Sequence, residues 1–373
     1  MSKNSLLEIQ NLSISLPEGG DRSHAVDKLN LDIIENEILC VVGESGSGKS
    51  MMARSIMGLL PKRLKITEGE IKFEDRFLNH LTPKKLQEIR GLSIAMIFQE
   101  PMSALNPLHS IGKQIEEVLL LHTSIKKKER RQRILEMLSA VHLPDPQQVM
   151  YAYPHEISGG QRQRAMIAMA LILEPKILIA DEPTTALDVT TQAQILKLIR
   201  DLQIEKQTGV IFITHDFGVV AEIADRIAVM KDGQLVEENE AQVILNSPKH
   251  IYTQELIRSV PDLKTPKLVD SSKPVLLKVD NLEKTYKRRR GFLSSSKSEV
   301  YAVNKIQFTL REGETIGLVG ESGSGKSTVA RCIVKLISSD GGSILYQQKD
   351  LTQMDRKSMM PYRKDIQMIF QDP

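Results

Sequence analysis

An octet of the form G-x-x-x-x-G-K-[ST] occurs twice in this chain of 373 residues and constrains its fold more than any other feature. In such a loop, backbone N–H groups surround nucleotide phosphates, the lysine reaches the outer phosphates and the hydroxyl holds Mg²⁺. Glycine is required because a Cβ would obstruct a loop that wraps around an anion. The octets consist of Gly43, Glu44, Ser45, Gly46, Ser47, Gly48, Lys49 and Ser50, and of Gly320, Glu321, Ser322, Gly323, Ser324, Gly325, Lys326 and Ser327. The sequence therefore predicts two nucleotide-binding loops.

Each octet lies between an apolar run and a helical pattern. The runs at 38–42 and 315–319 predict buried parallel strands. The segments 51–60 and 328–337 predict helices, so each loop would present phosphates to a helix N-terminus and its partial positive charge. The alternative is a glycine-rich turn without a ligand, but two octets with the same flanks argue against chance. The strand, loop and helix order indicates an α/β fold.

The chain repeats other segments at a spacing of about 270 residues: 276–282 resembles 6–12, and 366–373 resembles 94–101. This spacing indicates a duplicated domain. We expect a first domain at 5–260, a linker at 261–274 and an incomplete second domain at 275–373. The part of the first copy between 102 and about 246 has no counterpart in the second copy. We interpret the sequence as a fragment of a longer parent protein, or as the product of a disrupted reading frame.

The composition and charge of the chain limit which cellular compartment and which partners we expect. The net charge of +3 is spread through the chain, and residues 1–10 lack the basic start and apolar core of a signal peptide. Cys40 and Cys332 lie beside the two loops and are predicted to be small core residues in a reducing compartment. The basic insert at 287–290 would form a nucleic-acid patch or a solvated hairpin tip. The hairpin is favoured because no aromatic platform accompanies it. We therefore expect a cytosolic protein without a nucleic-acid partner.

Three further segments of the first copy carry chemistry. The apolar run 177–180 ends in Asp181 and Glu182, which suit a water-mediated Mg²⁺ contact and the polarisation of an attacking water. A second apolar run, 210–214, ends in His215. At the start of a helical pattern stand Ser158, Gly159, Gly160 and Gln161, which would present backbone donors to an anion. Ordinary strand ends and a simple serine N-cap are the alternatives.

In chain order, the first octet, Gln99, the segment 158–161, the pair 181–182, Asp188 and His215 resemble ABC-type ATPase domains. The resemblance covers about residues 5–260. It implies an α/β P-loop NTPase fold with a mixed sheet, a helical subdomain and an antiparallel β subdomain, followed here by the N-terminal part of a second copy. It also implies ATP and Mg²⁺ as ligands and dimerisation of ABC domains, in which the 158–161 cradle of one domain closes over the phosphate loop of another.

The resemblance implies a role for each position. Lys49 and Ser50 would bind phosphates and Mg²⁺, and Gln99 would contact the metal and the coupling region of a membrane partner. Glu182 would be the catalytic base, Asp188 would link the two sites, and His215 would contact the γ-phosphate. The implied metal ligands are Ser50, Gln99, Asp181, Ser327 and Gln371. The second copy adds Thr328 and Gln371 as implied ATP contacts, and Tyr286 as the ring that stacks on adenine; Leu16 takes the place of this ring in the first copy.

Longer segments of the sequence point to a subfamily. The segments 98–107, 180–188 and 247–254 are similar to the ATP-binding subunits of bacterial oligopeptide, dipeptide and nickel importers. Two domains in one chain resemble the fused ATPases of enterobacterial importers of peptides and microcin C. This implies two integral membrane permease subunits, indirectly a periplasmic solute-binding protein, and a peripheral location on the cytoplasmic face of the inner membrane. The alternatives are a soluble ABC ATPase acting on ribosomes or nucleic acid, and a truncated fragment that does not hydrolyse ATP.

Overall fold

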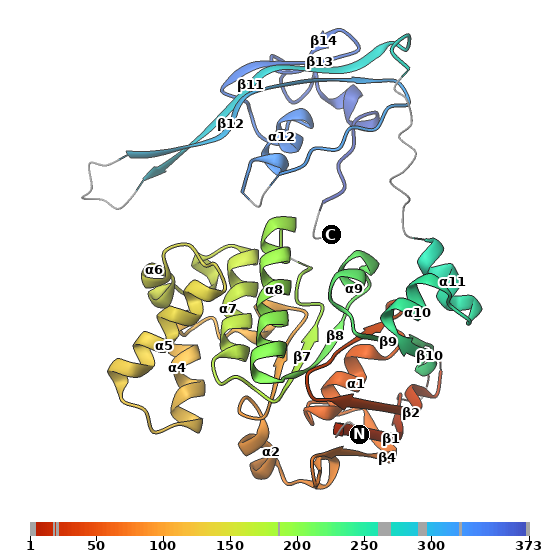
Figure 1. Cartoon of the computed structure of the whole chain (residues 1–373). Coiled ribbons are helices and arrows are strands. Elements are labelled where there is room, and N and C mark those ends of the chain that lie inside the picture. Colours follow the sequence, from red (N-terminus) through yellow and green to blue (C-terminus); the bar gives the residue numbers. More distant parts are fainter. Residues whose placement is uncertain are drawn as a thin grey trace. The chain divides into compact units, whose positions relative to one another are not determined.

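The computed structural model describes residues 5–17, 19, 22–185, 187–259, 270–289, 297–320 and 323–370, with the backbone alone at 287–289 and 297–298. The chain divides into two compact units, Met1–Pro261 and Asp262–Pro373, and each is described by itself (Figure 1). Most of the expected linker, 261–269, lies outside the described residues, as do Arg290 of the basic insert, Glu321 and Ser322 of the second octet, and Gln371.

A six-stranded mixed sheet forms the centre of the first unit (Figure 1). Its order is β10-β9-β3-β8-β7-β6, and every neighbouring pair is parallel except β10 with β9. The strands are β3 (Ile38–Val42), β6 (Ile94–Ile97), β7 (Ile177–Asp181), β8 (Gly209–Ile213), β9 (Arg226–Lys231) and β10 (Gln234–Glu240). The parallel strand predicted at 38–42 is confirmed as β3, and the apolar runs 177–180 and 210–214 form β7 and β8, with bounds that differ by one residue.

Both faces of this sheet are covered, which explains why its strands are continuously apolar. Alternate residues such as Cys40 and Phe212 pack in a core with α7 (Gly159–Leu171), α8 (Val189–Lys206) and α9 (Phe217–Ile223). Their neighbours, such as Val41 and Ile211, pack in a second core with α1 (Lys49–Ile56) and an antiparallel sheet. That sheet has the order β2-β1-β4-β5 and comprises β1 (Ser5–Ser15), β2 (His24–Ile34), β4 (Lys65–Phe73) and β5 (Arg76–Phe77).

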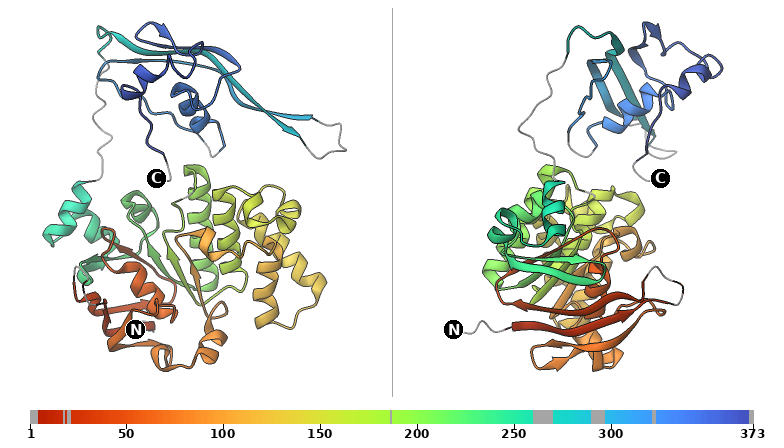
Figure 2. Two further views of the ribbon diagram at one scale, coloured as in Figure 1. Left: turned by 180° about the vertical axis from the view of Figure 1, so that it is seen from behind. Right: turned by 90° about the vertical axis from the view of Figure 1, so that its right-hand side faces the viewer.

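A group of helices stands beside α7, and the left view in Figure 2 shows it on the opposite side of the unit from the antiparallel sheet. Its members α4, α5 and α6 contact one another, and α4 and α5 also contact α7. The group comprises α4 (Ile111–His122), α5 (Lys127–Ala140) and α6 (Pro146–Tyr151). Other helices of the unit are α2 (Pro83–Ile89), α3 (Pro101–Ala104), α10 (Ala241–Asn246) and α11 (Ile251–Arg258), with short 3-10 helices η1 (Leu78–His80) and η2 (Pro154–Glu156). The mixed sheet, helical group and antiparallel sheet are the three parts that the sequence resemblance implied.

The second unit repeats the antiparallel sheet of the first. The order β12-β11-β13-β14 corresponds to β2-β1-β4-β5, and the positive φ of Asn281 (46°) matches that of Asn11 (48°). Its strands are β11 (Val275–Arg289), β12 (Lys297–Arg311), β13 (Gly341–Tyr346) and β14 (Lys349–Asp350). They pack on α12 (Lys326–Ile333), and η3 (Met360–Lys364) follows. Cys332 is buried in this core as Cys40 is in the first, and burial raises the pKa of both thiols. The two antiparallel sheets thus share their strand order and this turn conformation.

The prediction of a buried strand at 315–319 is wrong. This segment has no regular structure, and Leu318 and Val319 are 43% and 90% exposed. In the first unit the matching strand β3 pairs with β8 and β9, whose residues all follow position 208. The sequence contains no counterpart of β8 or β9 for the second copy, so an apolar run of the same pattern finds no strand to pair with. Ile369, in the segment that matches β6, is likewise 97% exposed.

Candidate functional site

The first octet forms a loop between β3 and α1, as the sequence predicts. Gly43 and Gly48 have φ values of 148° and 102°, and an added Cβ would lie 2.1 Å from the Met230 carbonyl oxygen or 2.4 Å from that of Ala25. Lys49 is the first residue of α1, and its ammonium donates to the carbonyl oxygens of Gly43 and Glu44, each at 2.8 Å. The loop is thus closed by its own lysine around a helix N-terminus, the arrangement that binds phosphate.

A cavity of about 530 Å³ opens beside this loop. Residues of the loop and of α1 line it together with side chains from the antiparallel sheet and from the ends of central strands. The lining comprises Leu16, Arg22, Ala25, Ser45, Gly46, Ser47, Gly48, Lys49, Ser50, Met51, Arg54, Leu64, Gln99 and Glu182. Its volume is within the range usual for small-molecule sites. The structure thus brings Gln99 and Glu182, far apart in sequence, to the phosphate loop.

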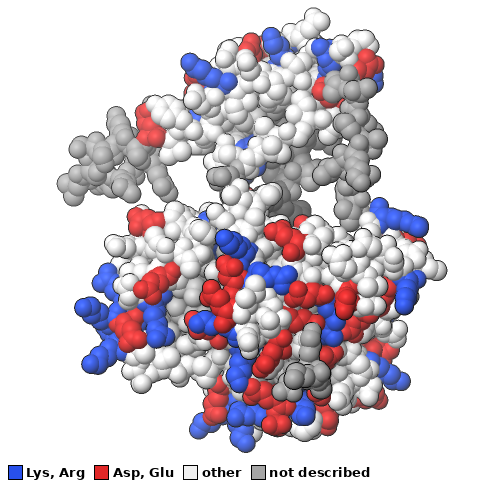
Figure 3. Space-filling view, viewed as in Figure 1, with Lys and Arg blue, Asp and Glu red and all other residues white. Residues whose placement is uncertain are grey.

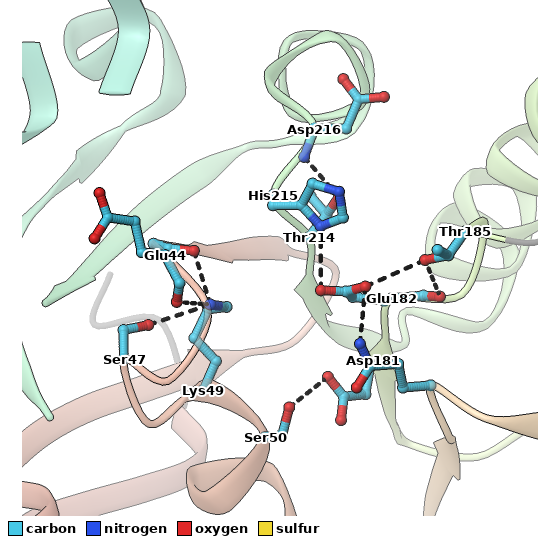
Figure 4. Close-up of polar contacts among 12 residues, drawn as sticks. Glu44, Ser47, Lys49, Ser50, Asp181, Glu182, Thr185, Thr214, His215 and Asp216 are labelled. Carbon is cyan, nitrogen blue, oxygen red and sulfur yellow. Dashed lines mark hydrogen bonds and ion pairs between the residues drawn. The ribbon is translucent and has the colours of Figure 1, made fainter. Parts of the chain in front are cut away.

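Asp181 and Ser50 face each other across the edge of the sheet (Figure 4). The Ser50 hydroxyl donates to the Asp181 carboxylate at 3.0 Å, and Asp181 is 1% exposed. Burial raises the pKa of Asp181 above its ordinary value, although the Ser50 hydrogen bond opposes the shift. Burial likewise lowers the pKa of Lys49, while Glu182 and Asp181 counteract this. A hydroxyl beside a buried carboxylate is a pair of oxygen ligands of the kind that Mg²⁺ takes.

We expect Asp181→Asn to stabilise the nucleotide-free protein at neutral pH. A raised folded-state pKa means that Asp181 contributes stability when protonated, at low pH, and loses that contribution as the pH rises through the folded-state pKa. Asparagine removes the buried charge and keeps an oxygen that accepts from Ser50. A gain of about 1 kcal/mol would raise the unfolding midpoint by about 2–4 °C. Thermal unfolding from pH 4 to pH 8 tests this: the gain should shrink as the pH falls, and a pH-independent difference would contradict the assignment.

Glu182 is held by three side chains. Its carboxylate accepts from the Gln99 amide at 3.0 Å and the Thr185 hydroxyl at 3.3 Å, and it lies 3.1 Å from Nδ1 of His215. These partners follow β6, β7 and β8, which are neighbouring strands of the central sheet. Figure 4 shows Thr185 and His215 on either side of Glu182. Glu182 has a φ of 49°, a left-handed backbone that turns the chain sharply after Asp181. The arrangement fixes one carboxylate at the mouth of the cavity, where it can accept a proton from water.

Asp188 and Ser158 begin helices. The Asp188 carboxylate caps α8 by accepting from the backbone N–H and hydroxyl of Thr191, and the hydrogen bond from that N–H is the largest cause of its lowered pKa. Ser158 and Gln161 form a reciprocal capping box at the start of α7. Neither cap lines the cavity. Ser158 is therefore an N-cap, and the predicted contact of this helix N-terminus with an anion stays a prediction.

Sequence reasoning missed Arg22 and Thr185. Arg22, in the turn after β1, donates to the Gly46 carbonyl oxygen and lies 3.6 Å from the Asp232 carboxylate. Thr185 donates to the backbone and the side chain of Glu182. No spacing in the sequence identified Arg22, because its partners lie 24 or more residues away. Thr185 lies within the segment 180–188, but its bond to Glu182 depends on the turn after β7, which the sequence pattern does not predict.

In the second unit the loop is described in part. The Lys326 ammonium donates to the Gly320 carbonyl oxygen at 2.6 Å, and Gly325 has a φ of 95°, as at the matching position of the first loop. Ser327 and Thr328 lie in the first turn of α12. Tyr286 is 44% exposed, with the Lys284 ammonium 5.8 Å from its ring centroid. Glu321, Ser322 and Gln371 lie outside the described residues.

The first unit combines a phosphate loop with a buried aspartate at the end of β7 and a glutamate bonded to three side chains. It builds this site on a mixed sheet with a helical group and an antiparallel sheet. These features define an ATP-hydrolysing domain of the ABC class. The ABC transporter family matches residues 26–185 and 303–373, and the oligopeptide/dipeptide transporter C-terminal region matches 236–295. The chain therefore belongs to the ABC transporter ATP-binding proteins, in the group that carries this C-terminal region. Members of this group bind nucleotide, form ABC-domain dimers and act with membrane permeases.

Several curated relatives extend along almost the whole chain. The peptidoglycan transport ATP-binding protein YejF of Agrobacterium fabrum is 45% identical over 99% of this chain and 67% of its own length. The uncharacterized ABC transporter ATP-binding protein YejF of Escherichia coli is 46% identical over 99% and 69%. The glutathione import ATP-binding protein GsiA of Escherichia coli is 41% identical over 99% and 64%. The chain thus spans about two thirds of the length of these relatives.

Solved structures resemble the chain over a single ABC domain. The ATP-binding cassette MJ0796, in its dimeric state bound to ADP and Pi, is 34% identical with a TM-score of 0.58, covering 63% of this chain and 98% of its own. CbiO1 from Clostridium perfringens, part of the transporter complex cbiONQ, is 28% identical with a TM-score of 0.54, covering 66% and 93%. Within the described ranges, no helix combines the length and apolar character that a bilayer crossing requires.

Proposed function

We propose that this chain supplies the ATP-hydrolysing subunit that energises the import of peptides, or similar small solutes, through two integral membrane permease subunits. One observation carries the proposal: Lys49, Ser50, Gln99 and Glu182 line one cavity, and Asp181 is bonded to Ser50. The names of the relatives, which refer to peptidoglycan and glutathione transport, favour a peptide-like solute. A nickel or other small-solute importer is the fallback.

The residues of the first loop fit Mg²⁺ and ATP. The Ser50 hydroxyl, the Asp181 carboxylate and the Gln99 amide oxygen are donors of the type that Mg²⁺ prefers. Bound Mg²⁺ would neutralise charge on the β- and γ-phosphates. Lys49 and the loop N–H groups would bind the phosphates, Glu182 would accept the proton of the attacking water, and His215 would contact the γ-phosphate. Gln99, which already bonds to Glu182, would also sense the permease.

A complete site requires a second ABC domain. The N-terminus of α7, with Ser158 and Gln161, does not line the cavity of its own unit. We therefore assign it to the loop of a facing domain, with Asp188 linking the two sites. We also propose that residues 5–260 form this ABC domain with its tail, that 261–274 link it to the second copy at 275–373, and that Lys326 and Ser327 bind a second nucleotide. The assembly would lie on the cytoplasmic face of the bacterial inner membrane, served by a periplasmic solute-binding protein.

On the face of the first unit drawn in Figure 3, acidic and basic side chains are interspersed over the surface. A protein that binds nucleic acid through its backbone phosphates would gather its basic residues in a continuous patch. On this face the described residues offer no such patch. The alternative of an ABC ATPase acting on ribosomes or nucleic acid therefore gains no support from this surface.

Uptake in the native bacterium tests the proposed function. The gene would be deleted, then restored as the wild-type chain or as Glu182→Gln, and entry of a labelled tetrapeptide, glutathione and nickel would be measured. We expect the wild-type chain to restore peptide uptake and the variant to leave it at the level of the deletion. Restored nickel entry alone would move the assignment to the fallback solute. Peptide uptake that is unaffected by deletion would contradict the proposal.

A further inference from the structure

The C-terminal tail of the first unit reaches the phosphate loop through one side chain. Tyr252, the second residue of α11, is 4% exposed, and its hydroxyl oxygen accepts the backbone N–H of Glu44 at 2.9 Å. The two residues are 208 positions apart. Tyr252 lies within the region 236–295 that matches the oligopeptide/dipeptide C-terminal region, so this contact joins the tail to the nucleotide site.

The peptide group between Gly43 and Glu44 is held at both ends. Its N–H donates to Tyr252, and its carbonyl oxygen accepts from the Lys49 ammonium at 2.8 Å. Hydrogen bonds at opposite ends of one peptide group polarise each other in the same sense. If the N–H loses its partner, the peptide group is free to rotate, and a rotation would carry the carbonyl oxygen away from Lys49. The tyrosine hydroxyl therefore affects the position of Lys49, the residue that would bind phosphate.

The tail holds Tyr252 in place independently of any nucleotide. The Glu237 carboxylate accepts the backbone N–H groups of Lys249 and His250, at 2.7 Å and 3.0 Å, and fixes the turn that leads into α11. The His250 ring accepts the Tyr252 N–H at 3.2 Å. The Lys231 ammonium lies 4.6 Å from the centroid of the Tyr252 ring. The hydroxyl is thus positioned by β9, β10 and the turn before α11, outside the loop that it contacts.

We propose that Tyr252 is a positioning residue of the nucleotide site: through it, the tail holds the peptide group between Gly43 and Glu44 in the orientation that keeps Lys49 ready for phosphate. By linkage, ATP bound at this loop stabilises the tail to the extent that the tail favours ATP binding. The inference rests on ATP binding by the first loop.

Tyr252→Phe tests this inference because it keeps the buried ring and removes only the hydroxyl. ATP affinity would be measured by calorimetry on the full chain carrying Lys326→Met, so that the measured binding is that of the first loop. We expect the Kd for ATP to rise about tenfold, because ATP binding would then have to fix a peptide group that Tyr252 no longer orients, and a tenfold change corresponds to the free energy of about one hydrogen bond. Tyr151→Phe, on a tyrosine that is 62% exposed, is the matched control and should leave the Kd unchanged.

Hydrogen exchange provides a readout that a purely structural role would not produce. In Tyr252→Phe the Glu44 amide should exchange at least tenfold faster, and added ATP should no longer slow exchange in the tail at 249–258. If Tyr252→Phe lowers the unfolding temperature but leaves the Kd and the ATP effect on the tail unchanged, the tyrosine is a packing residue and the inference is overturned. If Tyr252→Phe does not fold, Glu237→Gln, which loosens the turn before α11, should weaken ATP binding in the same direction. A chain with Tyr252 intact that binds no ATP would instead contradict the proposed function.

Discussion

Glu182→Gln should lower the ATP turnover number of this chain by about 10²–10⁴-fold, the range that a positioned general base contributes. Glutamine keeps the size of the side chain and its capacity to bond with Gln99, Thr185 and His215, but it cannot accept a proton from water. ATP binding should persist, because Lys49 and Ser50 remain in place. The variant should therefore hold ATP without releasing phosphate, and a phosphate-release assay beside an ATP-binding assay separates the two steps.

The concentration dependence of this activity is part of the same prediction. Because the N-terminus of α7 does not reach the cavity of its own unit, the turnover rate per chain should rise with protein concentration as first-unit dimers form. Glu222→Gln, an exposed glutamate on α9, is the matched control and should keep the wild-type rate. A rate per chain that is independent of concentration would mean that the site is complete within one chain, contrary to our assignment. Full activity in Glu182→Gln would remove Glu182 from the role of base.

Lys49→Met is the second change with a large expected effect: it should weaken ATP binding at the first loop by about 100-fold or more. Charge-assisted hydrogen bonds contribute about 1.5–3 kcal/mol each, and 100-fold corresponds to about 2.7 kcal/mol. Lys49 is 7% exposed and is the cation beside Asp181 and Glu182, so methionine would also leave two acidic groups to repel the phosphates. Calorimetric titration with Mg²⁺ and ATP measures the loss, and Lys113→Met, on an exposed position of α4, is the control.

The matching variant Lys326→Met should have a smaller effect on total ATP binding. Tyr286 would strengthen ATP binding at the second loop, because stacking on a base contributes about 1–3 kcal/mol. The first copy has Leu16 at this position. The second loop, however, follows the unpaired segment 315–319, and ordering a backbone costs about 1–2 kcal/mol per residue. Ordering several residues outweighs one stacking contact. If Lys326→Met removed the tighter site and Lys49→Met did not, this ranking of the two loops would be wrong.

The sequence by itself determined the parts of this protein that depend on local pattern. Glycines and a lysine at fixed spacing specify a loop that wraps an anion, and continuously apolar runs specify strands buried on both faces, such as β3 and β7. The order of the motifs carries the resemblance to ABC-type ATPases, and that resemblance implied a common site for residues that lie far apart in the sequence. Gln99, Glu182 and His215 lie together in the structure.

Only the tertiary structure decided what depends on contacts between distant segments. The runs 38–42 and 315–319 have the same local pattern, yet only the first is a strand, because β8 and β9 are there to pair with it. The bond from Glu44 to Tyr252 spans 208 residues and follows no spacing rule. The local sequence pattern indicates which secondary structure a segment prefers. Whether the segment pairs and is buried depends on which other segments of the chain contact it. For that reason the sequence predicted the phosphate loop, and the structure alone showed the hydrogen bond that joins this loop to the tail.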